Sequence, residues 1–336
     1  MTRLAVLGAG SWGTTFAQVL ADAGNDVVLW ARREEVAQEI TEHHTNHSYL
    51  GEHELPATVT ATSRIQDALD AAEGLVVAVP AQSLRATLSS WREQPGLASG
   101  LPAVPVLSLT KGIERGTDAR ISEVLIQAGA ARQDLVGVLS GPNLSAEIAD
   151  RRPCGTVVAA PSEELAGTFA RWCDAPYLRA YTSTDVMGVE IAGAVKNVVA
   201  IAVGAASGLG HGHNTTASLI TRGLAEITRL GVALGGARET FAGLAGMGDL
   251  VATCASPLSR NHRLGLALGR GLSIEQAVAE VGQTAEGVAT ARAVADLAER
   301  LGVDMPITRS VVAVVDHGAS IEQVTTALLS RSVRPE

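Results

Sequence analysis

The sequence predicts two domains: a doubly wound parallel α/β domain over residues 1–185, followed by an all-α domain over residues 186–336. Three observations predict this architecture. Short runs rich in Val and Leu alternate with amphipathic stretches through the first half, and the first of these runs leads directly into a glycine-rich turn. After residue 185, a helical spacing of apolar residues dominates and strand signals almost disappear.

The expected elements follow from these patterns. Six strands are expected in the first domain, each a nearly continuous apolar run as in buried parallel strands: RLAVLGA, DVVLWAR, GLVVAVP, VPVLSL, LVGVLSG and GTVVAA. Amphipathic helices are expected between some of them, over residues 11–23 and 63–72. In the second domain, helices are expected over residues 187–206, 215–234, 260–268, 274–281, 284–301 and 320–328.

The composition is that of a folded protein in a reducing compartment. Hydrophobic residues make up 46% of the chain and charged residues 18%, and the net charge is −9. This charge argues against binding to nucleic acid or to anionic membranes, because both carry phosphate. Three widely spaced cysteines form neither a zinc pattern nor a disulfide framework, and the N-terminus lacks the apolar segment of a signal peptide. We therefore expect a cytoplasmic protein without membrane insertion.

The segment LAVLGAGSWGTTFAQVLADAG predicts a dinucleotide site at the start of the chain. Gly8, Gly10 and Gly13 form a G-x-G-x-x-G pattern directly after an apolar run and at the beginning of a helix. In this context the glycines allow a tight turn and a close approach of the backbone to a pyrophosphate. The alternative interpretation is an ordinary glycine-rich turn between a strand and a helix.

The end of the second strand indicates which nicotinamide cofactor is bound. A domain that selects NADH places Asp or Glu there to bind the ribose hydroxyls, whereas DVVLWARR supplies Arg32 and Arg33. Guanidinium groups suit a 2′-phosphate, so NADPH is favoured and NADH is possible. Two arginines in a solvated loop are the alternative.

A lysine within an apolar helix is the most informative residue of the second domain. IAGAVKNVVAIAVGAASG places Lys196 and Asn197 among small and apolar residues, where an unpaired ammonium group is costly to bury. Lys196 must therefore be paired or take part in chemistry, and it argues against a membrane span. A second lysine, Lys111, follows the strand VPVLSL, at a strand end where open α/β sheets bind ligands; a surface lysine is the commoner explanation.

Two further polar clusters interrupt the helical half. Asp249 lies among three glycines in GLAGMGDL, which suggests an unusual backbone conformation beside a carboxylate. In SPLSRNHRLG, Ser259 is a good N-cap for a helix that begins at Arg260, with Asn261 in its first turn. Free N–H groups and the positive end of the helix dipole predict an anion site there. Without a bound anion, an arginine in the first turn would be unfavourable beside the positive end of the dipole, so Arg260 supports this prediction.

Together these segments resemble one family, the bacterial NAD(P)-dependent glycerol-3-phosphate dehydrogenases. The resemblance covers essentially the whole chain, and it rests on GAGSWGTT, LTKGIE, SGPN with a following AE, GAVKNVVAI, AGMGDLVATC, SPLSRNHRLG and TAEGV, in the family's order. It implies a Rossmann-type first domain and a reversible, NAD(P)H-dependent reduction of dihydroxyacetone phosphate to sn-glycerol 3-phosphate, which supplies phospholipid synthesis.

The resemblance also implies roles for individual residues. Cofactor contacts are implied for Gly8, Gly10, Ser11, Trp12, Gly13, Arg32, Arg33, Tyr49, Lys111, Ser145, Arg260, Thr284 and Glu286. Substrate contacts are implied for Lys111, Gly141, Asn143, Lys196, Asp249, Ser259, Arg260 and Asn261, with Lys196, Lys111 and Asp249 as the catalytic residues. The sequence departs from the family, which more often has Ser or Thr at position 143, Ala at position 145 and a Val-containing form of TAEG.

Lys196 is the proton donor in this interpretation, because reduction of the ketone creates an alkoxide at C2. The alternatives are a lysine that only locks helices, a β-hydroxyacid or phosphogluconate type of dehydrogenase, and a protein that senses NADPH without catalysis. We interpret the histidines of EHHTNH and HGHN as solvated loop without acidic partners, and expect no metal site. Apolar helical surface in the second half favours a homodimer.

Overall fold

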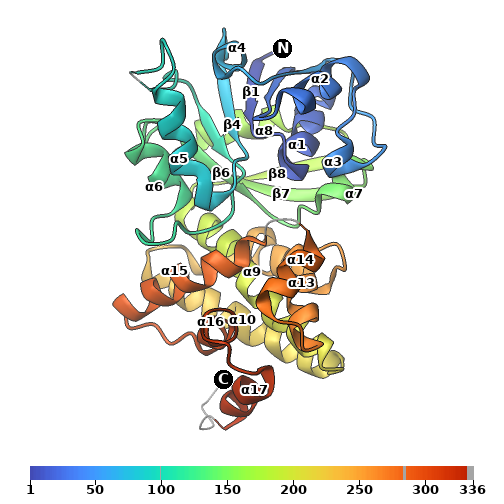
Figure 1. Cartoon of the computed structure of the whole chain (residues 1–336). Helices are drawn as coiled ribbons and strands as arrows, with labels where there is room; N and C mark the ends of the chain where they lie inside the picture. The colour runs from blue at the N-terminus through green and yellow to red at the C-terminus, as the bar shows by residue number, and fades with distance from the viewer. Residues whose placement is uncertain (99, 283–284, 331–336) are drawn as a thin grey trace. The chain divides into compact units, whose positions relative to one another are not determined.

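The protein is described by a computed structural model over residues 1–98, 100–282 and 285–330, and its chain divides into two compact units (Figure 1). Unit 1 consists of Met1–Lys111 and Ala119–Glu190, and unit 2 of Gly112–Asp118 and Ile191–Glu336. The chain therefore passes between the units three times.

Unit 1 is built on an eight-stranded sheet with the order β3-β2-β1-β4-β5-β6-β7-β8. The strands are β1 (Arg3–Leu7), β2 (Asp26–Trp30), β3 (Val59–Thr62), β4 (Gly74–Val77), β5 (Val106–Ser108), β6 (Val136–Ser140), β7 (Cys154–Ala159) and β8 (Leu178–Ser183). All neighbouring strands are parallel except β6 and β7. The doubly wound α/β prediction is confirmed, and the antiparallel pair corrects the expectation of a wholly parallel sheet.

Helices cover both faces of this sheet (Figure 1). On one face lie α1 (Ser11–Asp22), α2 (Glu34–His43), α3 (His47–Leu50), α7 (Ser145–Ala149) and α8 (Glu163–Trp172). Their core includes Phe16 and Phe169, both fully buried. The other face carries α4 (Ile65–Leu69), α5 (Ala81–Arg92) and α6 (Ile121–Gln127), with Leu84 and Trp91 in the core. The strand order reverses between β1 and β4, so their carboxyl ends form the edge where such sheets bind ligands.

Every element that the structure describes in unit 2 is helical, which confirms the all-α prediction. The helices are α9 (Val186–Gly208), α10 (His213–Ala233), α11 (Arg238–Ala242), the π-helical turn η1 (Leu244–Gly248), α12 (Asp249–Ala255), α13 (Arg260–Gly269), α14 (Ile274–Val281), α15 (Glu286–Arg300), α16 (Pro306–His317) and α17 (Ile321–Leu329). The first five residues of α9 belong to unit 1, and the rest of this helix belongs to unit 2.

α9 is long and apolar enough to cross a membrane by length and composition alone. In the protein, however, 83% of its most apolar window is buried. The core helix of a soluble protein has the same two properties. We therefore interpret α9 as a core helix.

Backbone contact joins α9 and α13. A Cβ added at Gly204 on α9 would lie 2.1 Å from the carbonyl oxygen of His262 on α13. In the opposite direction, a Cβ at Gly265 would lie 2.0 Å from the oxygen of Ile201, and one at Gly269 would lie 2.2 Å from the oxygen of Ala205. The glycines of both helices are therefore required for this close approach, which fixes α13 against α9.

Candidate functional site

The glycine-rich loop between β1 and α1 has the geometry of a phosphate cradle. Gly8 has a φ of +126°, and a Cβ there would lie 2.7 Å from the oxygen of Ala78. At Gly13, a Cβ would lie 1.9 Å from the oxygen of Gly8. Gly10, the N-cap of α1, makes no side-chain capping bond, and no described atom lies within 4 Å of a Cβ built on it. The loop is thus closely packed at Gly8 and Gly13 and open at Gly10. It fits a pyrophosphate bound by the N-terminal amides of α1.

Three residues predicted to contact the cofactor lie around this loop. The hydroxyl oxygens of Ser11 and Ser145 are 2.8 Å apart, so the structure brings the N-termini of α1 and α7 together. Trp12 packs edge to face on Phe16, and its indole Nε1 is buried without a hydrogen-bond partner in the described part of the chain. Tyr49 lies on α3 and is 38% exposed. These positions are compatible with cofactor contacts.

Asn46 is a residue of this region that the sequence analysis missed. Its Nδ2 donates to the backbone oxygen of Ala9, at 3.1 Å, and to Oγ1 of Thr14, at 2.8 Å. These bonds attach the segment before α3 to the glycine-rich loop and so hold Tyr49 near it. A single Asn in a polar segment forms no periodic pattern, so nothing in the sequence indicated that Asn46 is buried.

Arg32 and Arg33 lie just beyond the carboxyl end of β2, next to the loop after β1, because β1 and β2 pair in parallel. Both side chains are exposed. Arg33 is the N-cap of α2, and its Nε lies 3.8 Å from Oε1 of Glu35. Such an exposed pair is weak, so both guanidinium groups are accessible to a phosphate.

Lys111, Gly141 and Asn143 come together after the carboxyl ends of β5 and β6. Nζ of Lys111 donates to the backbone oxygen of Gly141 at 3.2 Å. Gly141 has a φ of +148°, and a Cβ there would lie 3.0 Å from Cα of Thr156. Nδ2 of Asn143 donates to Oγ1 of Thr156 at 3.0 Å, whereas its Oδ1 is buried and has no partner among the described residues. This leaves Oδ1 of Asn143 as a buried acceptor two residues after Gly141.

In unit 2, the structure explains the buried Lys196. Its Nζ donates to Oδ1 of Asp249, the first residue of α12, and to Oγ1 of Thr253 at 2.8 Å. Lys196 is 7% exposed and Asp249 is 1% exposed. The ammonium and carboxylate thus neutralise each other, which removes most of the cost of burying either charge alone. Thr253 was missed, although its i+4 spacing from Asp249 on a helix is the signal that predicts a shared face.

The turn before Asp249 is π-helical, which is the unusual backbone suggested by its glycines. Gly243 and Gly248 have negative φ, so left-handed geometry is not involved. A Cβ at Gly246 would lie 2.2 Å from the oxygen of Phe241, so this glycine is needed for close packing. π-helical turns recur at functional sites because they redirect side chains, and here η1 presents Asp249 to Lys196.

The start of α13 forms a second polar group. Oγ of Ser259 accepts the N–H of His262 at 3.2 Å, the predicted N-cap. Nδ2 of Asn261 donates to Oδ1 of Asn197 at 3.0 Å, and its Oδ1 accepts the N–H of Gly287 at 3.0 Å. Asn261 therefore ties α9, α13 and α15 together. Arg260 is the first residue of α13 and is partly buried.

Two residues remain from the predicted set. Glu286 is the first residue of α15, beside the Gly287 amide that Asn261 binds. Thr284 lies outside the described residues. The structure thus collects the predicted residues into two groups, one in each unit.

The expectation for the EHHTNH segment is wrong in two respects. His43 ends α2 and His47 begins α3, so they are not in a loop. His47 also has acidic partners, because its Nδ1 lies 2.6 Å from Oε1 of Glu39 and its Nε2 lies 3.2 Å from Oε1 of Glu52. The hydrogen bonds to Glu39 and then Glu52 raise the pKa of His47. Across the residues that the structure covers, no group of three or more His, Cys, Asp or Glu could hold a metal ion.

The fold and these two groups of residues define a class. A doubly wound sheet with a glycine-rich loop after its first strand, followed by a helical unit with a buried lysine, is typical of dinucleotide-dependent dehydrogenases. Within this class, the chain carries arginines in place of an acid after β2 and a buried Lys–Asp–Thr group.

Comparison with known proteins identifies the family. Residues 3–166 match the family described as NAD-dependent glycerol-3-phosphate dehydrogenase N-terminus, and residues 185–326 match the one described as its C-terminus. The glycerol-3-phosphate dehydrogenase (NAD(P)+) of Corynebacterium jeikeium (strain K411) is 50% identical over 337 residues, which is 100% of both chains. That of Streptomyces griseus subsp. griseus is 51% identical over 99% of this chain and 98% of its own.

A solved structure agrees with the sequence relatives. The crystal structure of glycerol-3-phosphate dehydrogenase from Coxiella burnetii superimposes with a TM-score of 0.90 and 34% identity, over 98% of this chain and 99% of that chain. This chain belongs to the NAD-dependent glycerol-3-phosphate dehydrogenase family, and it is an oxidoreductase that uses NAD(P). The family predicted from the sequence is confirmed.

Proposed function

We propose that this chain catalyses the reversible, NAD(P)H-dependent reduction of dihydroxyacetone phosphate to sn-glycerol 3-phosphate, with residues 1–185 binding the nucleotide and residues 186–336 supplying substrate and catalytic groups. The buried Lys196–Asp249 pair is the observation that carries this proposal. Family membership favours this reaction over a phosphogluconate type of dehydrogenase and over a non-catalytic sensor. When bound, the nicotinamide supplies a hydride to C2 of the ketone.

Lys196 donates a proton from Nζ to the C2 oxygen as negative charge develops there. Asp249 accepts a hydrogen bond from Nζ and favours the charged ammonium, which is the form that holds the proton to be given. The hydroxyl of Thr253 accepts a second bond from the same nitrogen and so restricts where the amine points. In the oxidative direction, the neutral amine takes the proton back from the hydroxyl of glycerol 3-phosphate.

Within unit 2, the start of α13 is assigned to the phosphate of the substrate. Arg260 and the helix N-terminus provide positive charge and N–H donors for an anion. Within unit 1, Lys111 is assigned to substrate and cofactor contacts at the strand end where it binds the backbone oxygen of Gly141. Ser259 and Asn261 act by shaping this end of α13, because their side chains already bind His262, Asn197 and Gly287.

Two measurements test the proposal. Absorbance of the reduced nicotinamide is followed after mixing protein and NADPH with dihydroxyacetone phosphate, and unphosphorylated dihydroxyacetone is the control. Oxidation that depends on the phosphorylated ketone supports the reaction and the anion site together. Tight NADPH binding without oxidation would move the assignment to another substrate or to a sensor.

The second measurement concerns the lysine itself. Replacing Lys196 with Met removes the amine but keeps much of the side-chain length, and it should lower kcat by about 10²–10⁴-fold with little change in NADPH affinity. A near-normal kcat would reduce Lys196 to a structural residue that locks helices.

The remaining assignments concern cofactor choice and context. Arg32 and Arg33 favour NADPH over NADH, because guanidinium groups suit a 2′-phosphate. A homodimer is supported by exposed apolar side chains of unit 2, at Met247, Val251 and Leu258. The molar mass, measured by light scattering during gel filtration, tests the dimer. A mass equal to that of one chain would contradict it. The cytoplasm as location and phospholipid synthesis as the use of the product complete the proposal.

A further inference from the structure

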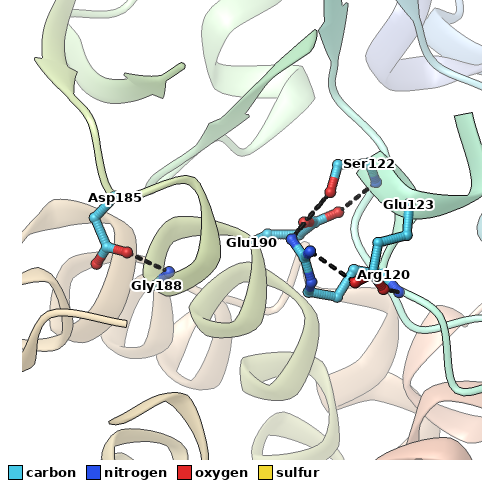
Figure 2. Close-up of polar contacts among 6 residues, drawn as sticks. All are labelled: Arg120, Ser122, Glu123, Asp185, Gly188 and Glu190. Atoms are coloured by element: carbon cyan, nitrogen blue, oxygen red, sulfur yellow. Dashed lines mark hydrogen bonds and ion pairs between the residues drawn. The ribbon is translucent and has the colours of Figure 1, made fainter. Parts of the chain in front are cut away.

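Two of the three places where the chain passes between the units are connected to each other within unit 1. The chain returns to unit 1 at Ala119 and leaves it again after Glu190, inside α9. Figure 2 shows the side chain of Glu190 directed at Arg120 and Ser122, which directly follow that return. The residues that make this connection therefore lie next to the positions where the chain passes between the units.

The connection is made of three short hydrogen bonds to one carboxylate. Oε1 of Glu190 accepts the backbone N–H of Ser122 at 2.7 Å. Oε2 accepts Oγ–H of Ser122 at 2.7 Å and Nη1–H of Arg120 at 2.8 Å. The side chain of Glu190 is only 3% exposed and that of Arg120 is 16% exposed. Both charged groups are therefore satisfied by these protein hydrogen bonds rather than by water. Burial raises the pKa of Glu190, and Arg120 and the Ser122 donors oppose that rise.

These bonds satisfy α6 as well as Glu190. Ser122 lies in the first turn of α6, where backbone N–H groups have no partner inside the helix. Glu190, on α9, provides an acceptor for the N–H of Ser122. Its negative charge also lies at the positive end of the α6 dipole. Arg120 itself is oriented by Glu123, whose Oε1 lies 2.8 Å from its Nη2. The carboxylate is thus fixed from several directions.

The other side of the same crossing is also held. Asp118, two residues before Arg120, pairs with Arg300 on α15, and both belong to unit 2. Only Ala119 separates a residue that is bound to unit 2 from a residue that is bound to Glu190. The residues on both sides of Ala119 are therefore held by ion pairs.

Glu190 and Lys196 lie on one continuous helix. They are six residues apart, which corresponds to about 9 Å along the axis and about 240° around it. An α-helix transmits rotation and translation over such a short distance, so a shift of α9 at Glu190 moves the amine of Lys196. Within the described part of α9, no proline interrupts this stretch.

We propose that Glu190 is a positioning residue for the reaction: with Arg120 and Ser122, it fixes the rotation and height of α9 where this helix leaves unit 1, and so fixes where the Lys196 amine meets the substrate. This inference rests on the proposed role of Lys196 as proton donor. Glu190 acts through α9 and contacts neither substrate nor cofactor in this proposal.

The test uses the full-length enzyme and three variants. Glu190→Gln removes the charge and keeps the shape, and Ser122→Ala removes one donor and leaves the ion pair. The matched control is Asp185→Ala, because Oδ1 of Asp185 accepts the N–H of Gly188 at 2.8 Å and caps the same end of α9 (Figure 2). For each variant, kcat and KM are measured, together with the isotope effect on kcat from NADPH deuterated at the transferred position.

A displaced amine slows the chemical step in every folded molecule. We expect kcat to fall at least tenfold in Glu190→Gln and two- to fivefold in Ser122→Ala. KM for NADPH should stay within twofold, and the isotope effect should rise. Asp185→Ala should keep kcat within twofold and the isotope effect of the wild type. A loss of folded protein alone lowers the apparent kcat but leaves the isotope effect unchanged, which separates positioning from stability.

The outcomes distinguish this inference from the proposed function. If Glu190→Gln does not fold, Ser122→Ala carries the test. Wild-type isotope effects in both variants overturn the positioning role, and so does an equal rise in Asp185→Ala. In either case an inactive Lys196→Met variant still supports the proton donor. A fully active Lys196→Met variant overturns the proposed function instead.

Discussion

Replacing Glu226 with Gln should remove a pH dependence from the stability of unit 2. Glu226 is a buried residue of α10, and its carboxylate binds the start of α16: Oε1 accepts the N–H of Ile307 at 2.7 Å and Oε2 accepts the N–H of Thr308 at 3.2 Å. Burial raises the pKa of Glu226 from 4.5 to about 7, although these amides act in the opposite direction. The folded protein therefore holds the proton more tightly than the unfolded chain does.

The direction and size of the effect follow from this difference in pKa. The stability contributed by protonated Glu226 is fully present below pH 4.5 and is lost as the pH rises through about 7. Each unit of pKa difference corresponds to about 1.4 kcal/mol. From pH 5 to pH 8, the contribution of this residue to the free energy of unfolding should fall by about 2.5 kcal/mol.

Urea unfolding, followed by circular dichroism between pH 5 and pH 8, measures this change. The quantity to compare is the difference in free energy of unfolding between wild type and Glu226→Gln, since other groups titrate equally in both. Glu239→Gln, an exposed carboxylate on α11, is the control. A difference that stays constant with pH, or that grows in favour of the wild type as pH rises, would refute the reasoning.

Three other predictions concern packing, cofactor choice and metal. Gly204→Ala should cost about 1–3 kcal/mol of stability, because its Cβ meets the backbone of α13; Gly212→Ala, in open space, should cost far less in the same thermal melt. Replacing Arg32 and Arg33 with Ser should lower kcat/KM for NADPH about tenfold and leave NADH within twofold, and equal efficiencies with both cofactors in the wild type would contradict the assignment. Turnover should be unchanged after treatment with EDTA, and a loss restored by added metal would reveal a site that the sequence did not predict.

The buried parts of the fold could be predicted and the peripheral parts could not. The six apolar strands are all present, because a central parallel strand needs apolar residues on both faces. β3 and β8 were not predicted; they are the two edges of the sheet, and polar or exposed residues such as Thr60 and Tyr181 break their apolar pattern. The helix predicted over residues 63–72 is shorter in the structure, where α4 covers Ile65–Leu69.

Among the helices, periodicity decided what was predictable. α14 begins and ends at the predicted residues, and α9 and α13 lie within two residues of theirs. α16 was missed because its β-branched run ITRSVVAVV also suits a strand, whereas Pro306 at its first turn and Glu226 from α10 make it a helix. α12 was missed because it is short and follows a glycine-rich turn.

The candidate site shows a similar limit. Lys196 and Asp249 each stood out as polar residues in apolar or glycine-rich surroundings, but they are 53 residues apart in the sequence. The pair of Arg120 and Glu190 could not be predicted for the same reason, because these residues are 70 positions apart in the sequence. No local pattern encodes a pair whose contact depends on the packing of distant elements.

Backbone contact between α9 and α13 limits how this enzyme can change its substrate range. α9 carries Lys196 and α13 begins at Arg260, and the glycines between the helices leave no side-chain layer that could be trimmed or enlarged. The span between Lys196 and Arg260 is therefore a fixed length. Directed evolution toward longer polyol phosphates should leave Gly204, Gly265 and Gly269 unchanged and vary the loop that precedes α13 instead.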